Sequence, residues 1–279
     1  MTLAKLAGKI CRLVTLMDEL NANDQTTTPS PPEWDVGFDR IPMVEFSEDV
    51  KVARISNFRN FRYECDGTHT PHWETREFQI DDVCNLEFIV VPFTNQPHLA
   101  HTMVSFGFKS GQHLSISVEA RRRWQQPYSI VKGLFGAFPL TYIIADERDT
   151  IGLRTEYRQD VVHLYPSSAS SDQVRQLLLS MLRRASQLSV KPESYNTLTN
   201  NCLTNLRDHT NEIWPGRVRW NWRIVFNGHV GYLAYQLGLL KGGDSFESLD
   251  EKARINDLAQ GNWHREDFSK LIRARWFDV

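Results

Sequence analysis

The order in which two hydrophobic periodicities follow one another constrains the fold of this chain most strongly. From residue 43 to 166, apolar residues alternate with polar ones in short runs such as "REFQI" and "HLSISVE", which predicts β-strands. Beyond residue 170 the apolar spacing becomes three or four residues, which predicts helices over 170–189 and 201–213. Strands followed by helices are typical of the α+β class, so we expect an antiparallel sheet with packed helices. The C-terminal part is expected to be helical, near 229–240, 248–258 and 264–274.

The first 33 residues differ in pattern from the rest of the chain. Apolar residues recur at helical spacing over residues 1–21, which predicts an amphipathic helix, and residues 22–33 are rich in Thr, Pro and Asn, as in a linker. The helix is expected to pack on the folded domain or, alternatively, to make a peripheral membrane contact through residues 3–17. Charged residues interrupt every apolar run, so neither a signal peptide nor a transmembrane segment is expected.

The charge balance and the cysteine pattern exclude several kinds of partner. The 279 residues carry 32 basic and 34 acidic side chains, and the net charge of −2 supplies no general field for nucleic acid. The four cysteines form no CxxC pair, which argues against a zinc knuckle or a disulfide scaffold. His98 and His101 lie three residues apart on an expected strand, so they point to opposite faces. The glycines of "GLFGAF" lack the Lys-Ser/Thr of a phosphate loop. We therefore expect no metal and no cofactor.

One cysteine has the surroundings of a nucleophile. Cys202 follows two asparagines, so Asn200 or Asn201 is expected to cap the helix and Cys202 to lie in its first turn. The helix dipole and the free N–H groups at this end stabilise a thiolate. A lone cysteine at a helix start is nevertheless more often a small buried residue. The position alone therefore does not assign its chemistry.

A base and an orienting carboxylate come from two expected strands. His101 begins one strand and Glu119 ends the next, and the turn "KSGQ" between them predicts a hairpin. A three-residue loop at 110–112 makes Glu119 oppose Met103 and brings His101 and Glu119 to one face as diagonal neighbours. With a two-residue loop Glu119 points to the other face. His113, near the loop, is the alternative base or third member.

Further residues around these elements have candidate supporting roles. Asn200, Asn201 and Tyr195 are candidate oxyanion donors beside Cys202, although helix capping and core packing would also explain them. The segment "ADERD" is expected to form a structural ion network rather than a substrate site. "RVRWNWRI" interleaves arginine with tryptophan, which in a chain of near-neutral charge favours a strand or loop with one apolar face over a surface that stacks nucleotides.

Five segments in order carry a resemblance to a known family: HLAHTMVSFGF, HLSISVEARR, YIIADERDTIGLRTEYR, VHLYP and YNTLTNNCLTN. Together, from about residue 34 to 240, they resemble the Lnb N-terminal periplasmic domain family, a bacterial domain of poorly known function. The order of His101, Glu119 and Cys202 also resembles that of circularly permuted papain-like enzymes of the NlpC/P60 and lecithin:retinol acyltransferase kind. The resemblance implies a permuted papain-like domain over 34–240, followed by a helical extension over 241–279.

Two functional hypotheses follow. In the first, the protein is a cysteine-dependent hydrolase or acyl or amide transferase: Cys202 attacks an amide or ester, His101 transfers the proton and Glu119 orients His101. Its substrate would be a peptide, a glycan such as peptidoglycan, or a lipid. In the second, it is a non-catalytic envelope module that binds such a ligand in a papain-like groove. The family resemblance implies the periplasm or cell envelope, whereas the residues alone would favour the cytoplasm. The oligomeric state stays open.

Overall fold

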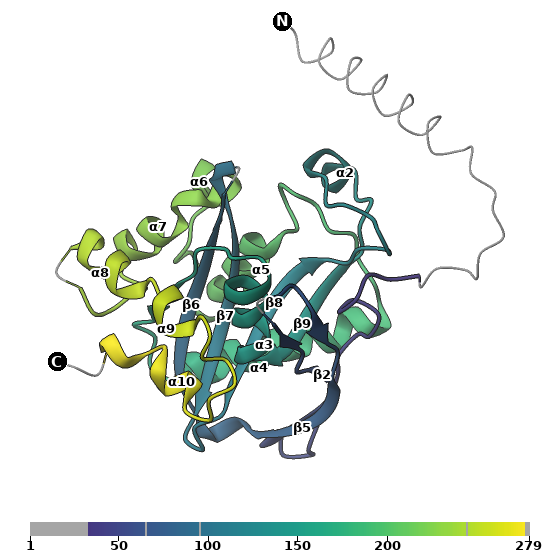
Figure 1. The fold of residues 1–279 in the computed structure, drawn as a ribbon, viewed down its shortest axis with the longest axis horizontal. Coiled ribbons are helices and arrows are strands. Elements are labelled where there is room, and N and C mark those ends of the chain that lie inside the picture. The colour runs from purple at the N-terminus through teal and green to yellow at the C-terminus, as the bar shows by residue number, and fades with distance from the viewer. Residues whose placement is uncertain (1–32, 65, 95, 244, 277–279) are drawn as a thin grey trace, which may run out of the picture. The chain divides into compact units, whose positions relative to one another are not determined.

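The structure is a computed structural model that describes residues 33–64, 66–94, 96–243 and 245–276 (Figure 1). The expected N-terminal helix (1–21) and nearly all of the expected linker (22–33) lie outside the described residues. Residues 34–279 form one compact unit. Its strands lie in the first part of the chain and most of its helices in the second, as the hydrophobic pattern predicts, so the α+β class is confirmed.

An eight-stranded sheet is the centre of the described part of this unit. The strands are β1 Met43–Phe46, β2 Val52–Arg59, β5 Trp73–Gln79, β6 Val83–Phe93, β7 Gln96–Phe108, β8 His113–Ala120, β9 Leu140–Asp146 and β10 His163–Pro166. Their order is β1-β2-β9-β8-β7-β6-β10, with β5 also paired to β2, and β3 (Arg62–Tyr63) forms a separate ribbon with β4 (His69–Thr70). The pairings are antiparallel except that of β2 with β9, where Arg59 pairs with Ala145. The expected all-antiparallel sheet is therefore mixed.

The helices are short apart from two. Their bounds are α2 Ile130–Leu134, α3 Glu147–Gly152, α4 Ser171–Val190, α5 Cys202–Ile213, α6 Trp222–Val225, α7 Val230–Gln236, α8 Phe246–Ala253, α9 Asn256–Ala259 and α10 Phe268–Leu271. A π-helical turn, η2 (Leu153–Tyr157), continues α3, and single 3-10 turns lie at Ile80–Asp82 (η1), Asn227–His229 (η3) and Ala274–Trp276 (η4). The three helical stretches expected in the C-terminal part are present, but they are shorter and more interrupted than expected.

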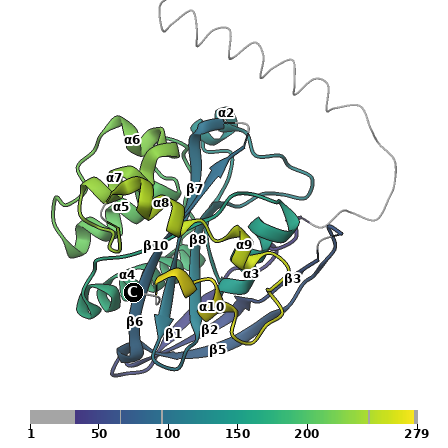
Figure 2. The same cartoon turned by 60° about the vertical axis from the view of Figure 1, so that its left-hand side comes forward.

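Both faces of the sheet are buried, and the alternation along β6 shows how. Phe88 and Val90 belong to the larger core, which the helices α4, α5 and α7 share. Ile89 and Val91 point the opposite way, into a second core that α9 and α10 cover (Figure 2). Because successive side chains of a strand alternate between faces, a run of apolar residues such as "FIVV" is stable only when both faces are covered.

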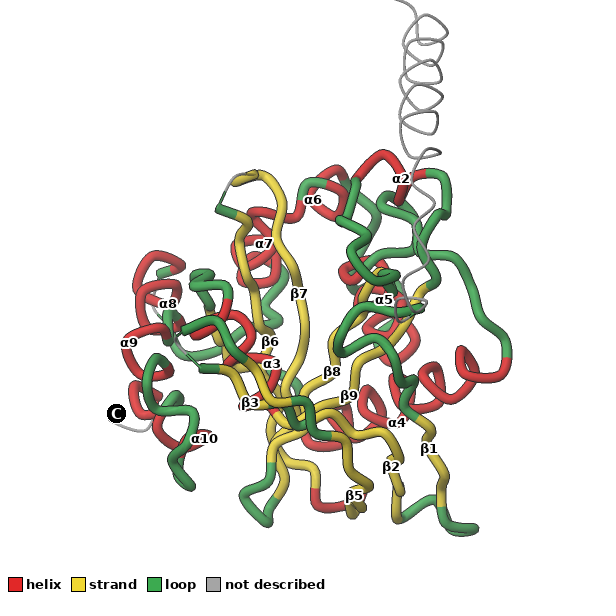
Figure 3. Tube along the Cα trace, turned by 45° about the vertical axis from the view of Figure 1, so that its right-hand side comes forward, coloured by secondary structure: helices red, strands yellow, loops and turns green. Residues whose placement is uncertain are grey.

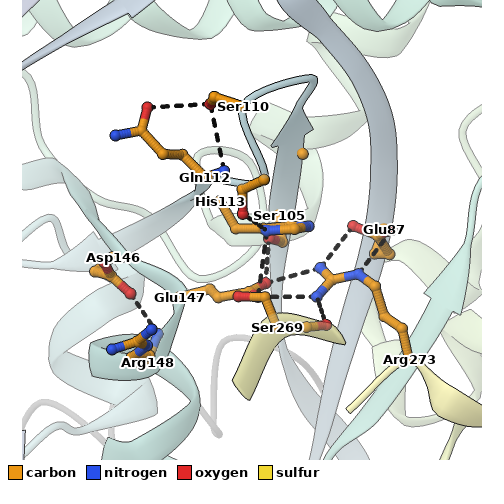
Figure 4. A network of polar contacts seen from close by, with 12 residues as sticks. Glu87, Ser105, Ser110, Gln112, His113, Asp146, Glu147, Arg148, Ser269 and Arg273 are labelled. Carbon is orange, nitrogen blue, oxygen red and sulfur yellow. Dashed lines mark hydrogen bonds and ion pairs between the residues drawn. The ribbon is translucent and has the colours of Figure 1, made fainter. Parts of the chain in front are cut away.

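A buried ion network joins the C-terminal helices to the sheet (Figure 4). The Arg273 guanidinium makes paired hydrogen bonds of 2.8–3.1 Å to the carboxylates of both Glu87 and Glu147, and all three side chains are buried. Ser105 donates a 2.7 Å hydrogen bond to Glu147, and His113 lies 3.8 Å from the same carboxylate. Removing one member would leave an uncompensated buried charge, so the network fixes the position of α10.

Two further carboxylates of the "ADERD" segment, Asp146 and Asp149, also form ion pairs within the chain. Asp146 caps α3 and pairs with Arg76 at 2.7 Å. Asp149 is fully buried and accepts from the Arg59 guanidinium at 2.7 Å and from the Phe61 N–H at 2.7 Å. The expected ion network is therefore present, since Asp146 and Asp149 are paired with Arg76 and Arg59 of this chain.

Candidate active site

The hairpin of β7 and β8 sets which side chains can meet. Gly107 pairs with His113 and Met103 with Ser117, so the expected pairing of Glu119 with Met103 is wrong by two residues. Phe108 donates to the Gln112 carbonyl at 3.0 Å, and Gly111 (φ +83°) is the left-handed residue that this loop requires. A shift of two residues keeps every side chain on its face. His101 and Glu119 therefore share a face, with His101 opposite Glu119 in the extended register.

The two strands stop pairing before they reach this position. The last pair is Met103 with Ser117, and beyond it β7 and β8 diverge (Figure 3). β7 continues its pairing with β6, where His101 lies opposite Val91, and β8 continues with β9, where Glu119 lies opposite Thr141. α5 packs against both strands, and Cys202, its first residue, lies beside His101 and Thr102 of β7.

The start of α5 at Cys202 is fixed by its cap. Asn201 is the N-cap: its Oδ1 accepts from the Thr204 N–H at 2.9 Å, and the Thr204 hydroxyl accepts from the Asn201 N–H at 2.7 Å. This reciprocal capping box holds the backbone at the helix entry. The Asn201 amide also donates to the Thr197 carbonyl at 2.6 Å, which fixes the preceding loop. Cys202 is thus the first helical residue, where the helix dipole favours a thiolate.

His101 and Ser117, which are buried, and the half-buried Glu119 form a polar triplet on the sheet. His101 Nε2 lies 2.7 Å from Ser117 Oγ and 3.1 Å from Glu119 Oε1, and the Ser117 hydroxyl donates to Glu119 Oε1 at 2.8 Å. Nε2 therefore faces this pair of oxygens, and the other ring nitrogen, Nδ1, takes no part in the triplet. Arg154, from the π-helical turn η2, lies 3.7 Å from the same Glu119 oxygen.

The electrostatics of this triplet favour a charged histidine. Burial alone would lower the pKa of His101, but the Glu119 carboxylate and contacts with the Cys202 thiol outweigh it and raise the pKa to about 9. Burial would raise the pKa of Glu119, whereas the His101 charge, Arg154 and the Ser117 hydroxyl hold it well below its usual range. Glu119 therefore stays ionised, and it keeps His101 protonated at neutral pH.

Cys202 is buried beside the same histidine. Burial would raise the pKa of its thiol, but the neighbouring His101 side chain and its charge outweigh this effect, with a smaller contribution from Thr102. The Thr102 hydroxyl is buried and has no hydrogen-bond partner among the described residues. The net effect is a lowered thiol pKa, so the arrangement favours a thiolate beside an imidazolium. Cys84 and Cys202 are both free among the described cysteines.

A cleft of about 950 Å³ opens above the Cys202–His101–Glu119 group. One wall comes from η2 and the neighbouring loop, with Arg154, Tyr157 and Arg158. The opposite wall is the segment before and within α2, with Trp124 and Tyr128. The cleft thus combines aromatic and cationic side chains and has room for a substrate much larger than a single residue.

Of the remaining predicted site residues, Tyr195 and Asn201 line the cleft, whereas Asn200 and His113 do not. Tyr195 is buried, lines the cleft and packs edge-on against Tyr128, and burial and the nearby Cys202 thiol raise its pKa. Asn201 lines the cleft but acts as the helix cap described above. Asn200 does not line it, because its amide donates to Ser194 O at 2.9 Å and its oxygen accepts from Asn205. His113 lies six residues along β8 from Glu119, about 20 Å away, and belongs to the Glu147 network instead.

Several residues of this site were not predicted from the sequence. Ser117 lies on the same strand face as Glu119, two residues earlier, which a period-two pattern does indicate. Arg154, Thr102 and Asn227 have no such signal. Asn227 holds the strand immediately before His101, since its amide oxygen accepts from Ala100 N at 2.8 Å and its nitrogen donates to Ala100 O at 2.7 Å. It therefore positions the histidine through the backbone.

The site belongs to the broad class in which a cysteine at a helix start contacts a histidine–carboxylate pair inside an open cleft. Residues 69–228, more than half of the chain, match the Lnb N-terminal periplasmic domain family, and the protein belongs to that family. No curated protein and no solved structure matches the chain. In the part of the chain that the structure describes, no three His, Cys, Asp or Glu side chains are grouped as metal ligands would be. No helix there combines the length and the apolar character that crossing a bilayer requires.

Proposed function

We propose that the protein is a cysteine-dependent hydrolase or acyl or amide transferase, with a permuted papain-like arrangement of its catalytic elements. The observation that supports this most strongly is the contact chain from Glu119 through His101 to Cys202, at the floor of the large cleft. A nucleophile bonded to a base that a third group orients is the general arrangement for acyl transfer through a covalent intermediate.

The proposed reaction proceeds in two half-reactions. The Cys202 thiolate attacks the carbonyl carbon of an amide or ester, and a C–S bond forms. His101 gives its Nδ1 proton to the leaving nitrogen or oxygen, the C–N or C–O bond breaks, and a thioester remains on Cys202. An incoming water, amine or alcohol then loses a proton to His101 and attacks the thioester, which restores the thiolate. Water as the acceptor gives hydrolysis, and any other acceptor gives transfer.

Two groups are suited to hold the negative charge on the carbonyl oxygen. The first N–H groups of a helix have no acceptor within the helix, and the Asn201 cap takes that of Thr204, so the Cys202 N–H is one proposed donor. The Tyr195 hydroxyl is the other, because its pKa is raised and it therefore stays protonated beside Cys202. Asn200 and Asn201 are less suited, since their amide nitrogens already donate to carbonyls.

The cleft walls suggest a peptide, glycan or lipid-like substrate. Aromatic side chains such as Tyr128 and Tyr157 can pack against sugar rings or apolar groups, and Arg158 can pair with an acidic substituent. The amide or ester to be cleaved would lie above Cys202, between the two walls.

A covalent trap tests this proposal. The protein would be incubated with panels of p-nitrophenyl esters and peptide and peptidoglycan-fragment thioesters, and intact-mass spectrometry would detect an acyl adduct. We expect one adduct on Cys202 and a burst of p-nitrophenol equal to the enzyme concentration. Cys202→Ala should abolish both and Cys84→Ala neither. Adducts that form equally on Cys84 and Cys202, with no burst, would contradict the proposal and favour a binding module.

A further inference from the structure

Large apolar side chains are exposed on the segments that also line the cleft. Phe135 is 75% exposed, Trp222 61%, Trp220 52% and Phe226 51%. Such side chains are normally buried, and a cluster of them on a surface indicates an interaction site. We call the following six residues the apolar rim: Trp124, Phe135, Leu198, Trp220, Trp222 and Phe226.

The rim comes from three segments that meet at one end of the molecule. The segment with α2 is joined to the loop before α5, because the Thr197 hydroxyl donates to Ile130 O at 3.1 Å. The segment with α6 closes the other side, since Val225 lines the cleft and Asn227 bonds to β7. α2 and α6 lie at the same end of the sheet in both views (Figures 1 and 3). Each of the three segments thus also contributes lining residues to the cleft that contains Cys202.

The three rim segments are rich in basic residues. Residues 120–145, 194–207 and 213–243 contain no Asp and no Glu, whereas they contain Arg121, Arg122, Arg123, Lys132, Arg207, Arg217, Arg219, Arg223 and Lys241. Two of these arginines are paired with carboxylates of other segments, Arg122 with Asp35 and Arg207 with Asp208. The segments that carry the apolar rim are therefore net basic although the whole chain has a net charge of −2. Fields of one sign attract an extended surface of opposite charge.

Arginines lie over the exposed indoles of the rim. The Arg207 guanidinium is 5.7 Å from the Trp220 ring and that of Arg223 is 5.5 Å from the Trp222 ring. Tryptophan and arginine together are suited to the lipid headgroup region, where the indole meets the acyl boundary and the guanidinium meets phosphate. The "RVRWNWRI" motif, which the proposed chemistry does not use, therefore has the composition of a segment that binds lipid headgroups.

We propose that the apolar rim docks the protein onto anionic lipid bilayers, with the mouth of the cleft facing the headgroups. Trp220, Trp222 and Phe226 insert from one side of the opening and Phe135 from the other, while the arginines of the same segments pair with lipid phosphates. This interaction does not depend on Cys202 chemistry, so it goes beyond the proposed function.

Vesicle binding of the full chain tests the proposal. Vesicles of phosphatidylglycerol and phosphatidylcholine, and vesicles of phosphatidylcholine alone, would be mixed with the wild type and with Trp220→Ser/Trp222→Ser. We expect binding to the anionic vesicles, at least about tenfold weaker binding by the double variant, and little binding to neutral vesicles. The control is Met43→Ser/Val190→Ser, which removes two exposed apolar side chains outside the rim and should bind as the wild type does.

Brominated lipids give a second readout that is specific to the rim. Acyl chains brominated near the headgroup should quench wild-type fluorescence, and Trp220→Phe/Trp222→Phe should still bind but lose most of the quenching. Three results would overturn the proposal. One is wild-type binding that the rim variants leave unchanged, which would point to residues 3–17. Another is concentration-dependent self-association that the rim variants abolish, with no vesicle binding. The third is rim tryptophans that acrylamide cannot reach in the free protein.

Discussion

Glu119 Oε1 lies 3.1 Å from His101 Nε2, and the Ser117 hydroxyl joins the two. This contact forms where β7 and β8 have ceased to pair, so it is made by side chains rather than by the sheet. It holds the imidazole in one orientation and, with Cys202, raises the pKa of His101 to about 9. The properties of Cys202 follow from this pair.

Replacing Glu119 by glutamine should lower the pKa of His101. The Glu119→Gln variant keeps the shape and the hydrogen-bonding capacity of the side chain but removes its charge, so the pKa should fall from about 9 toward 6.5. The Cys202 thiol pKa should rise with it, because the nearby positive charge is lost at neutral pH. Titration of the His101 ring by NMR would measure the first effect. Glu77→Gln, an exposed strand glutamate paired with Arg54, is the control and should leave His101 unchanged.

Thr102→Val should separate thiol reactivity from stability. The Thr102 hydroxyl is buried and has no hydrogen-bond partner among the described residues, so its loss should leave the free energy of unfolding unchanged or slightly higher. Thr102 also lies beside Cys202 and lowers its thiol pKa, so in the variant this pKa should rise and the alkylation rate at pH 7 should fall several-fold. Thr102→Ser, which keeps the hydroxyl, should retain the wild-type rate. A parallel loss of stability and reactivity in Thr102→Val would show that the residue acts only through packing.

The pH dependence of stability should differ between the wild type and Cys202→Ser. A raised His101 pKa stabilises the fold fully below 6.5, and this contribution is lost as pH rises toward 9. A lowered Cys202 pKa acts in the opposite direction over the same range, because that contribution grows with pH. In the wild type the two slopes offset one another. In Cys202→Ser only the histidine remains, so the free energy of unfolding should fall by up to about 1.4 kcal/mol per pH unit from pH 6.5 up to the His101 pKa, which lies below 9 once the contribution of Cys202 is lost. Urea titrations at several pH values would measure this, and equal slopes would contradict the ion pair.

Arg273→Met should destabilise the protein strongly while leaving the thiol site chemically intact. The change leaves the carboxylates of Glu87 and Glu147 buried without their cation, which typically costs about 3–5 kcal/mol. Thermal unfolding would measure the effect. Arg265→Met is the matched control, because its pair with Asp267 is exposed and its loss should change little. Similar Tm values for the two variants would show that the buried network contributes little to stability.

The sequence predicts the fold class and the order of the site residues better than it predicts their contacts. Strand and helix periodicities identify the elements that carry His101, Glu119 and Cys202. The register of the hairpin, by contrast, depends on Gly111 taking the third loop position, which moves every cross-strand partner by two residues. A register shift of an even number of residues leaves each side chain on the same face of the sheet. His101 and Glu119 are therefore expected on one face even from the wrong register.

Residues that reach the site from distant segments could not be predicted in this way. Arg154 meets Glu119 because a π-helical turn follows α3, and no residue type signals such a turn. Asn227 reaches Ala100 across 127 residues of sequence. His113 has the residue type of a base and lies near the right strand, but the burial of Glu147 places it in a structural network instead. Local patterns carry no information on these tertiary contacts.

The rate of Cys202 alkylation as a function of pH shows whether this thiol is ionised at neutral pH. Iodoacetamide labelling followed by peptide mass spectrometry measures Cys202 and Cys84 in the same sample, so Cys84 is an internal reference. We expect Cys202 to react through a thiolate already populated at neutral pH, with an apparent pKa clearly below the 9.0 of an unperturbed thiol, and Glu119→Gln to raise this value. A Cys202 whose apparent pKa is 9.0 or higher, in the wild type and in Glu119→Gln alike, would contradict it.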